Sequence, residues 1–525
     1  MSALLLRGGE VVDGTGAPAR RADVGIRDGR VAAIGTDLAA DGARVLDVRG
    51  LTVTPGFIDI HSHSDEAVLA NPALESTLRQ GVTTVVAGNC GGSSAPVMGL
   101  AAEELDREVA RFGVERTWTS FGEYVATVER GGMSINFTSL VGHGTLRQSV
   151  IGGGADAPAA GELAAMKAVL ASALRDGALG LSTGLIYPPS AYGTTDEIVA
   201  LARVVADAGG VYASHIRNEG DRLLEAVEEG IEIGRRAGVR VQLSHHKASG
   251  PKNWGRVRDS TERIEAAQRE GVDVIADQYP YTASSTGLAV TIPNWVHEGG
   301  SLALTERLRD PGVRARIRDE YVETGRSWDR IVIALARHRP EWTGRSVAAL
   351  AAEAGRDPLE WTCDALVLHE GDVQIVHHSM NEDDVRHVMR RPWTCVGSDS
   401  RACATYGVLH QGKPHPRAYG TFPRVLGHYA RDEGVLGFED AVRKMTSLTA
   451  SRLRLRDRGV LREGAWADLA IVDRARVRDT ATFDEPHRYP EGIPHVIVNG
   501  EVALHDGETA PGRHGRFLRL GVDAG

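Results

Sequence analysis

The sequence predicts an α/β protein, namely a (β/α)8 TIM-like barrel with a small β domain formed by both termini and an inserted lid segment. Three observations predict it. The middle of the chain alternates short apolar runs with helical patterns, both ends read as short strands separated by glycine-containing turns, and one internal stretch fits neither pattern. The length of 525 residues is sufficient for a barrel with one or more appendages.

The two ends of the chain have similar strand patterns. Residues 4–7 read as a short strand, and residues 23–27 alternate apolar and polar side chains before an Asp-Gly pair, which is a hairpin signal. Near the other end, apolar residues 495–498 turn at an Asn-Gly pair. We therefore expect residues 1–54 and 456–525 to form one small β domain.

Residues 55–455 predict the barrel. Leucines and a methionine recur at helical spacing in residues 163–174, and an apolar run follows them directly. Apolar runs typical of buried strands lie at residues 178–181, 211–214, 239–243 and 272–276. About nine candidate strands result, because residues 373–376 compete with residues 394–397 for one position in the barrel.

Residues 285–345 do not fit the alternation of strands and helices. The stretch contains Pro293, Trp295, Trp342 and a Gly-Gly pair, and it has no repeated helical period. A segment of this length within a compact barrel is typical of an insertion with a function of its own. We expect it to follow one barrel strand and to cover the site as a lid.

The composition excludes several classes of partner. The net charge is −10 and is spread along the chain, whereas a nucleic acid or an acidic membrane surface would require a basic patch. The N-terminal apolar run is too short for a signal peptide, and no 18-residue apolar segment follows. Four cysteines in so long a chain do not make a disulfide framework. We expect a cytoplasmic protein with a small-molecule partner, and the sequence leaves its oligomeric state open, a monomer included.

The first candidate metal ligands are His61 and His63, which follow the apolar segment 55–60. Histidines at positions i and i+2 of a strand point to the same side. At the C-terminal end of a barrel strand, that side faces the catalytic mouth. Two neutral imidazoles there supply half of the ligands of a first-row metal. The context Gly-Phe-Ile-Asp disfavours the alternative of two surface histidines on a loop.

Further candidate ligands end the next strands. Cys90 lies in Gly-Asn-Cys-Gly-Gly, and its thiolate would be a strong zinc ligand that can bridge two metals. His215 and His245 each close an apolar run, thirty positions apart, which is about the length of one βα unit. Three ligands leave a fourth position open, as a catalytic zinc requires. His246 would point away from His245 along a continuing strand, so we expect it to pack or to support the ligands.

Asp399, in Val-Gly-Ser-Asp-Ser, ends the last barrel-like run. A carboxylate beside a metal site can take a proton from water and deliver it to a leaving amine. The alternative is that Asp399 caps a following helix, since Ser-Asp-Ser is common at such positions. The residues alone do not decide between the two.

Taken together, these motifs resemble the N-acyl-D-amino-acid deacylase (D-aminoacylase) family of the amidohydrolase superfamily. The order His-x-His, His, His, Asp is similar to the metal set of the superfamily, and the two ends resemble its composite β domain. The family resemblance rests on Gly-Asn-Cys-Gly, Ser-His-Ile-Arg-Asn-Glu, Ser-His-His-Lys, Tyr-Pro-Tyr-Thr-Ala and His-Pro-Arg-x-Tyr-Gly-Thr-Phe-Pro-Arg. It covers nearly the whole chain.

The resemblance implies zinc-dependent removal of the acyl group from N-acyl-D-amino acids, and the D configuration comes from it alone. It implies one tightly bound zinc on Cys90, His215 and His245, and a second, weaker site on His61 and His63 with Cys90. It implies that Asp399 is the general base and acid. The family's residues for the substrate α-carboxylate correspond to Lys247, Tyr279 and Arg417, Tyr281 could exchange roles with Tyr279, and Ser285 is expected near the acyl oxygen.

Two features separate this chain from members of the family. The stretch from Asp399 to Arg417 is longer than in the shortest members, so this loop could reshape the pocket. Relatives specific for acidic D-amino acids place an arginine after Tyr-Pro-Tyr, whereas residues 283–301 here contain no Arg or Lys. They offer Leu288, Val290, Ile292 and Trp295 instead, which favours substrates with neutral or hydrophobic side chains.

Two other functions are weighed against deacylation. A cyclic-amide hydrolase similar to hydantoinases and dihydroorotases would keep the fold, but those relatives usually bridge their metals with a carbamylated lysine, where this chain has Cys90. A non-catalytic amidohydrolase-like scaffold would typically have lost metal ligands, and none of the expected ligands is missing here.

Overall fold

The computed structural model describes residues 3–322 and 327–525. Its middle consists of parallel strands that alternate with helices, which confirms the predicted α/β class. The parallel strands are β6 (Phe57–Asp59), β7 (Val82–Ala87), β8 (Asn136–Ser139), β9 (Val141–Gly142), β10 (Gly180–Gly184), β11 (Val211–His215), β12 (Arg240–Leu243), β13 (Val274–Gln278) and β17 (Thr394–Val396).

These strands pair in chain order. One sheet has the order β6-β7-β8 and the next has the order β9-β10-β11-β12-β13-β17, with Leu140 alone between β8 and β9. A parallel bridge from Ser62 to Ser400 joins the segments that follow β6 and β17. The competition between two candidate strands is thereby resolved, because β17 pairs with β13 and residues 373–376 pair elsewhere.

Helices cover the outside of these strands. They are α1 (Ala67–Ala70), α2 (Glu75–Leu78), α3 (Gly99–Ala110), α4 (Phe121–Gly131), α5 (His143–Val150), α6 (Ala160–Arg175), α7 (Thr195–Asp207), α8 (Leu223–Ala237), α9 (Val257–Arg269), α14 (Glu382–Met389), α15 (Arg417–Arg424), α16 (Phe438–Met445) and α17 (Ser447–Leu453). Strands β7, β10 and β11 are buried at every position, as expected for parallel strands covered on both faces. Helix α8 buries Leu223, Val227 and Ile231 on one stripe and leaves its charged residues outside.

The two ends of the chain share one sheet. Its order is β21-β20-β19-β18-β5-β1-β2-β3, and β4 also pairs with β1. The strands are β1 (Leu4–Val11), β2 (Arg20–Arg27), β3 (Arg30–Gly35), β4 (Arg44–Asp47), β5 (Thr52–Pro55), β18 (Leu469–Val472), β19 (His495–Val498), β20 (Glu501–His505) and β21 (Glu508–Thr509). The N-terminal and C-terminal strands meet where β5 pairs with β18.

Alternation along the terminal strands separates two cores. In β18, Leu469 and Ile471 pack into a small cluster within the terminal sheet, whereas Ala470 and Val472 pack into the main core. This follows from the two-residue period of a strand. Residues near the C-terminus pack against the parallel strands instead of the terminal sheet. Phe517 and Leu518 belong to the main core, and Phe517 forms a bridge with Phe137 of β8.

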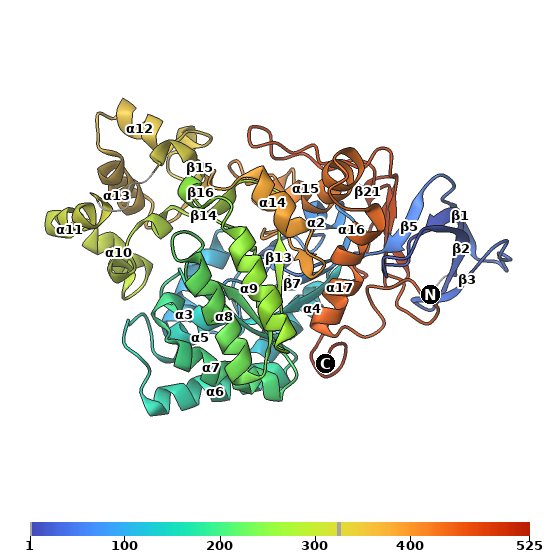
Figure 1. Cartoon of the computed structure of the whole chain (residues 1–525), viewed down its shortest axis with the longest axis horizontal. Coiled ribbons are helices and arrows are strands. Elements are labelled where there is room, and N and C mark those ends of the chain that lie inside the picture. The colour runs from blue at the N-terminus through green and yellow to red at the C-terminus, as the bar shows by residue number, and fades with distance from the viewer. Residues whose placement is uncertain (1–2, 323–326) are drawn as a thin grey trace.

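The insertion is a separate layer with a core of its own. Strands β14 (Ser284–Gly287), β16 (Val373–His377) and β15 (Ile331–Ala336) form a three-stranded antiparallel sheet. Helices α10 (Ser301–Arg307), α11 (Pro311–Val322), α12 (Val347–Glu353) and α13 (Pro358–Leu368) pack with this sheet. The insertion and the terminal strands lie at opposite ends of the long axis, with the parallel strands between them (Figure 1).

The layer extends past the predicted end at residue 345. Its hydrophobic cluster runs from Leu288 to Ile375, because β16 lies between β14 and β15 and completes the sheet. The apolar run 373–376 that resembled a barrel strand is therefore the central strand of the insertion. Among the described residues, no helix is long and apolar enough to cross a membrane.

A buried polar network ties the terminal sheet to β8. Asp468 forms an ion pair with Arg458, and its Oδ2 accepts a hydrogen bond from Asn136 Nδ2 at 3.0 Å. Asn499 donates its backbone N–H to Asp468 Oδ1 at 2.7 Å and its side-chain amide to Asn136 Oδ1 at 2.8 Å. The side chains of Arg458 and Asp468 are 1% and 5% exposed, so neither charge can turn to water.

We expect Asp468→Ala to lower the free energy of unfolding by about 3–5 kcal/mol, because it leaves the Arg458 guanidinium buried and unpaired. Asp457→Ala is the matched control. Asp457 pairs with Arg30 and Arg462 at the surface, so its loss should cost about 1 kcal/mol or less. Guanidinium chloride unfolding measures both, and equal losses in the two variants would contradict the role of the buried network.

Candidate metal centre and catalytic site

Every predicted metal ligand lies at or just beyond the carboxyl end of a parallel strand. His61 and His63 follow β6, Cys90 follows β7, His215 is the last residue of β11, and His245 follows β12. The carboxyl ends of neighbouring parallel strands open on the same edge. The fold therefore brings together five side chains that are up to 184 positions apart in the sequence (His245 minus His61).

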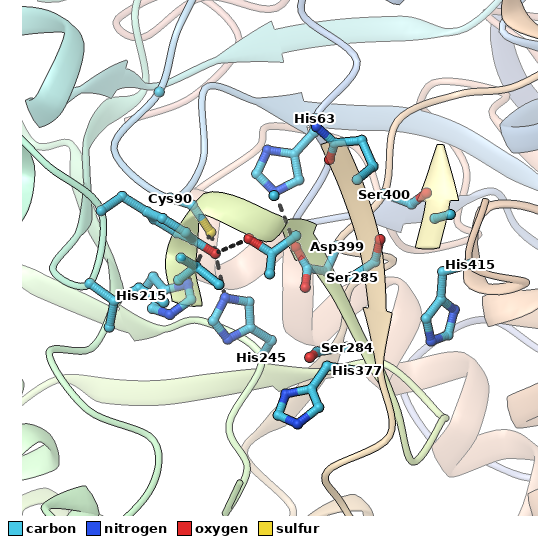
Figure 2. A pocket seen from close by; sticks show the side chains of 18 of the residues that line it. His63, Cys90, His215, His245, Ser284, Ser285, His377, Asp399, Ser400 and His415 are labelled. Carbon is cyan, nitrogen blue, oxygen red and sulfur yellow. Dashed lines mark hydrogen bonds and ion pairs between the residues drawn. The ribbon is translucent and has the colours of Figure 1, made fainter. Parts of the chain in front are cut away.

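The sulfur of Cys90 is the common point of this cluster (Figure 2). Its Sγ lies 3.3 Å from His61 Nε2, 3.6 Å from His215 Nδ1 and 3.5 Å from His245 Nε2. Two groups of possible ligands share this sulfur. One is Cys90, His215 and His245, the other is His61, His63, Cys90 and Asp399, and the ligand atoms within each group lie within 4.8 Å of one another.

The donor chemistry fits zinc. A thiolate and imidazoles are the ligands that zinc prefers, and three protein ligands leave a position for water or substrate. One nitrogen of each of three histidines faces the sulfur, namely Nε2 of His61, Nδ1 of His215 and Nε2 of His245. The ion supplies a Lewis acid and an activated water when it is bound.

The electrostatics of the cluster favour the ligand form of Cys90. Burial alone would raise the pKa of the thiol, but the nearby His61 and His245 outweigh it and hold that pKa well below its usual range. Burial also opposes the charged form of His63. Its hydrogen bond to Asp399 and its proximity to Cys90 nevertheless raise the pKa of His63 to about 9. A thiolate surrounded by imidazoles attracts a cation at neutral pH.

Three residues of the cluster have left-handed backbone conformations. Cys90 has φ 52°, His245 has φ 36° and Asp399 has φ 50°. Such conformations cost free energy in residues other than glycine and cluster at functional sites. Backbone hydrogen bonds hold two of them, since His245 N donates to Asp277 Oδ1 at 2.8 Å and Asp399 N donates to His61 O at 2.7 Å.

Asp399 faces the cluster instead of a helix. Its Oδ1 lies 3.0 Å from His63 Nε2 and 3.4 Å from His61 Nε2, and its Oδ2 lies 2.8 Å from the guanidinium of Arg417. Burial opposes ionisation, but Arg417 and the histidines hold the pKa of Asp399 well below its usual range. The next helical element begins at Gly407, so Asp399 does not cap a helix directly after it.

The predicted carboxylate-binding residues occupy different positions around the cluster. Lys247 and Arg417 are buried beside it, and both line the cavity together with Ser285. Arg417 also donates to the backbone oxygen of Ser285 at 3.3 Å and lies over the ring of Tyr279, 4.5 Å from its centroid. Tyr281 faces away, because its hydroxyl donates to Asp479 at 3.4 Å. The ring of Tyr279 is the one in contact with Arg417, but its hydroxyl donates to Met380 Sδ at 3.7 Å and neither tyrosine lines the cavity.

His246 packs behind the ligands. Its Nε2 lies 2.8 Å from the hydroxyl of Ser260 on α9, and burial with the neighbouring Lys247 lowers its pKa to about 4. It is absent from both groups of possible ligands.

The cluster lies at the base of a cavity of 1260 Å³. The insertion supplies part of its wall through Thr286 of β14, Leu335 of β15 and Arg330, which directly precedes β15. The long stretch from Asp399 to Arg417 supplies another part through Arg401, Cys403, Leu409 and Gln411. Lys413 ties this stretch to the insertion, since its backbone N–H donates to Ala334 O at 2.7 Å.

Comparisons with known proteins agree with this geometry. The model of the amidohydrolase family matches residues 44–504. D-aminoacylase from Alcaligenes xylosoxydans xylosoxydans is 39% identical over 98% of this chain and 97% of its own length. N-acyl-D-glutamate deacylase from the same organism is 40% identical over 98% of this chain and 96% of its own length.

The chain belongs to the N-acyl-D-amino-acid deacylases of the amidohydrolase family. Among solved structures, N-acyl-D-glutamate deacylase from Bordetella bronchiseptica, complexed with zinc and a phosphonate inhibitor, is 37% identical. It aligns with a TM-score of 0.83 over 98% of this chain and 99% of its own. A D-hydantoinase aligns over the whole chain with a TM-score of 0.56 at 13% identity, a likeness of fold alone.

The structure adds Glu219 to the residues predicted for this deacylase-family site. Its Oε1 lies 3.0 Å from His245 Nδ1, 2.5 Å from Lys247 Nζ and 3.9 Å from His215 Nε2. Despite burial, Lys247 and the two histidines hold its pKa below the usual range. One signal for Glu219 was present in the sequence, since it ends the Ser-His-Ile-Arg-Asn-Glu motif, but spacing does not show which atoms it contacts.

Asp277 and Tyr187 were also missed. Asp277 Oδ1 lies 3.3 Å from His61 Nδ1, so it supports the ligands of the second group as Glu219 supports those of the first. Tyr187 lines the cavity with its ring 5.0 Å from that of His215, and its hydroxyl lies 3.0 Å from Thr286 Oγ1 of the insertion. Neither residue belongs to a short motif that names its chemistry.

We expect Glu219→Gln to weaken zinc binding about 10–100-fold, because a carboxylate behind a histidine ligand fixes the orientation and proton of its ring. Asp221→Asn is the control, since Asp221 lines the same cavity but pairs with the exposed Lys252. Competition with a chelator measures zinc affinity in both variants. Unchanged affinity in Glu219→Gln would contradict the positioning role.

Proposed function

We propose that this chain is a zinc-dependent hydrolase that cleaves the amide bond of N-acyl-D-amino acids into a carboxylate and a free D-amino acid. The observation that supports it most is the convergence of Cys90, His215 and His245 with Asp399 at one end of the parallel strands. We infer that these strands, with β8 and β9 as one interrupted strand, form the (β/α)8 barrel. Cys90, His215 and His245 hold the tight zinc, and His61 and His63 with Cys90 form the second, weaker site.

Asp399 carries the proton in this proposal. Its carboxylate takes a proton from the attacking water and delivers it to the departing nitrogen, so that the C–N bond breaks without releasing an amide anion. The contact with Arg417 keeps the carboxylate ionised before the reaction begins. His63, hydrogen-bonded to the other carboxylate oxygen, fixes its orientation.

Lys247 and Arg417 bind the substrate α-carboxylate. Arg417 contacts Asp399 through one nitrogen and Ser285 O through another, and a guanidinium has five N–H donors in all. Lys247 contacts Glu219 and both Nδ1 and O of His245. Nε2 of His245 faces the Cys90 sulfur, so this nitrogen would hold the ion, and Nδ1 would carry a proton and donate to Glu219. One N–H of Lys247 would then be available to the substrate.

The cyclic-amide alternative is not favoured. Dihydroorotase and adenine deaminase relatives match only 16% of this chain each, whereas the deacylases match 98%. The bridging position holds the Cys90 sulfur, and the described hydrogen bonds of Lys247 fix it behind His245. A scaffold function has no support either, because all five predicted ligands are present and grouped.

The residues that line the cavity limit the choice of substrate side chain less than the candidate ligands and Asp399 limit the choice of reaction. Leu288 and Ile292, which suggested a hydrophobic preference, are buried in the core of the insertion and do not line the cavity. Val290 does line it, together with Ile186 and Leu409, and on these we base a preference for neutral or hydrophobic side chains. Arg330 favours the second candidate, an acidic side chain, because it lines the cavity without an ion-pair partner among the described residues.

The first test is acid release from N-acetyl-D-methionine and N-acetyl-L-methionine by zinc-loaded protein. We expect turnover of the D form alone. Asp399→Asn should bind zinc and lose turnover by several orders of magnitude, because it cannot accept a proton. Hydrolysis of a hydantoin without hydrolysis of either methionine derivative would replace the proposal, and full activity of Asp399→Asn would remove Asp399 from the mechanism.

The side-chain preference is tested with N-acetyl-D-methionine against N-acetyl-D-glutamate. We expect kcat/KM to favour methionine, and Arg330→Leu to leave that ratio nearly unchanged. If the acidic substrate is preferred, Arg330→Leu should lower its kcat/KM about 10–100-fold, the worth of a charged hydrogen bond. Arg337→Leu serves as the control, because Arg337 lines the same cavity but already pairs with Asp372.

A further inference from the structure

A second cluster of metal-binding side chains lies in the terminal sheet. His495 begins β19, His505 ends β20, and Asp506 follows directly in the turn to β21. Val496 pairs with Leu504, so His495 and His505 are the next residues outward on the two antiparallel strands. Cross-strand neighbours on one face come within reach of a common ligand. None of the three residues lines the cavity of the catalytic site.

The spacing of the two imidazoles suits a shared ion. Their Nδ1 atoms lie 3.2 Å apart, and the rings are inclined at 29° with centroids 5.0 Å apart. The backbone N–H of Asp506 donates to His495 Nδ1 at 3.3 Å, and an ion at that nitrogen would replace this hydrogen bond. A metal about 2.05 Å from each nitrogen would subtend an angle of about 103°, close to the tetrahedral value of about 109°. The Asp506 carboxylate lies 3.7 Å from Nε2 of each ring, and one ligand atom from each residue falls within 4.8 Å of the others.

The exposure of the cluster also suits an ion with water ligands. The side chain of His495 is 6% exposed and fixed by the sheet, whereas those of His505 and Asp506 are 42% and 77% exposed. One face of the group is therefore rigid and the other is open to solvent. Two imidazoles and a carboxylate suit zinc, nickel or copper and not the harder magnesium or calcium ions.

We propose that His495, His505 and Asp506 form a peripheral site for a divalent transition-metal ion, separate from the catalytic centre. An ion there links β19 to the turn between β20 and β21. This turn also contacts the barrel side, because Arg79, which follows α2, pairs with Glu508 at 3.0 Å and donates to the backbone oxygen of Gly507. Binding therefore stabilises the attachment of the hairpin.

Another histidine pair provides a matched control. His410 and His487 are even closer, with ring centroids 4.0 Å apart. Both nitrogens of His487 are already engaged, Nδ1 with Tyr419 and Nε2 with the backbone oxygen of Gly412. No carboxylate joins this pair to form a ligand group among the described residues. Two close imidazoles without a third ligand beside them should bind no metal.

The test is a nickel titration of the zinc-loaded enzyme by calorimetry, with His505→Ala, Asp506→Asn and His410→Ala as variants. We expect wild type and His410→Ala to bind one more equivalent of nickel than His505→Ala, apart from any nickel that the weaker site on His61, His63 and Cys90 takes up in all variants. Asp506→Asn should bind this equivalent more weakly, and nickel should raise the unfolding temperature of wild type by more than that of His505→Ala.

Three outcomes would overturn the proposal. They are no nickel uptake by wild type, equal numbers of nickel equivalents in wild type and His505→Ala, and a number in His410→Ala as low as in His505→Ala. His505 is partly exposed at a strand end, so its replacement should leave the fold intact, which far-ultraviolet circular dichroism checks. The result does not depend on whether the catalytic centre hydrolyses N-acyl-D-amino acids.

Discussion

The Cys90 sulfur lies within 3.6 Å of imidazole nitrogens on three other segments, and much of the architecture serves to keep it there. A buried thiolate is costly unless cations or a metal surround it. The backbone at Cys90 is left-handed and lies close to that of Gly184. A side chain at position 184 would not fit, because its Cβ would lie 2.0 Å from the Cys90 oxygen. The parallel strands therefore function as a frame that positions one sulfur among histidines.

A second layer of charge makes this arrangement tolerable. Glu219 and Asp277 lie behind the histidines, on the side away from Cys90. Lys247 pairs with Glu219, and Arg417 pairs with Asp399. Positive and negative groups thus alternate from Arg417 through Asp399 and the histidines to Glu219 and Lys247. Removing one partner leaves the next one buried without compensation, which couples the positions of the histidines to those of Asp399, Arg417 and Lys247.

Residues that directly follow a strand could be predicted from the sequence. Residues that reach the same site from a loop could not. His61, Cys90, His215 and His245 could be singled out because each follows an apolar run, and the structure places them in two groups that share Cys90, with Asp399 added to the group of His61. Glu219 lies in a loop, and its contacts depend on side-chain directions that no periodicity encodes. Residues 373–376 read as a barrel strand because apolar content is the same in both sheets, and only pairing partners distinguish them.

The same limit explains why side-chain preference is harder to infer than chemistry. Leu288 and Ile292 are buried in the insertion's own core, whereas Arg330, 38 positions after Ile292 (330 minus 292), lines the cavity. The candidate ligands and Asp399 lie beyond the carboxyl ends of the parallel strands, but another part of the wall comes from the insertion and from the loop between Asp399 and Arg417. Since β14 begins at Ser284 and Arg417 holds Ser285 O, the two walls meet at the residue that also contacts Asp399. Changes in either wall can therefore alter the substrate accepted, provided that this junction is kept.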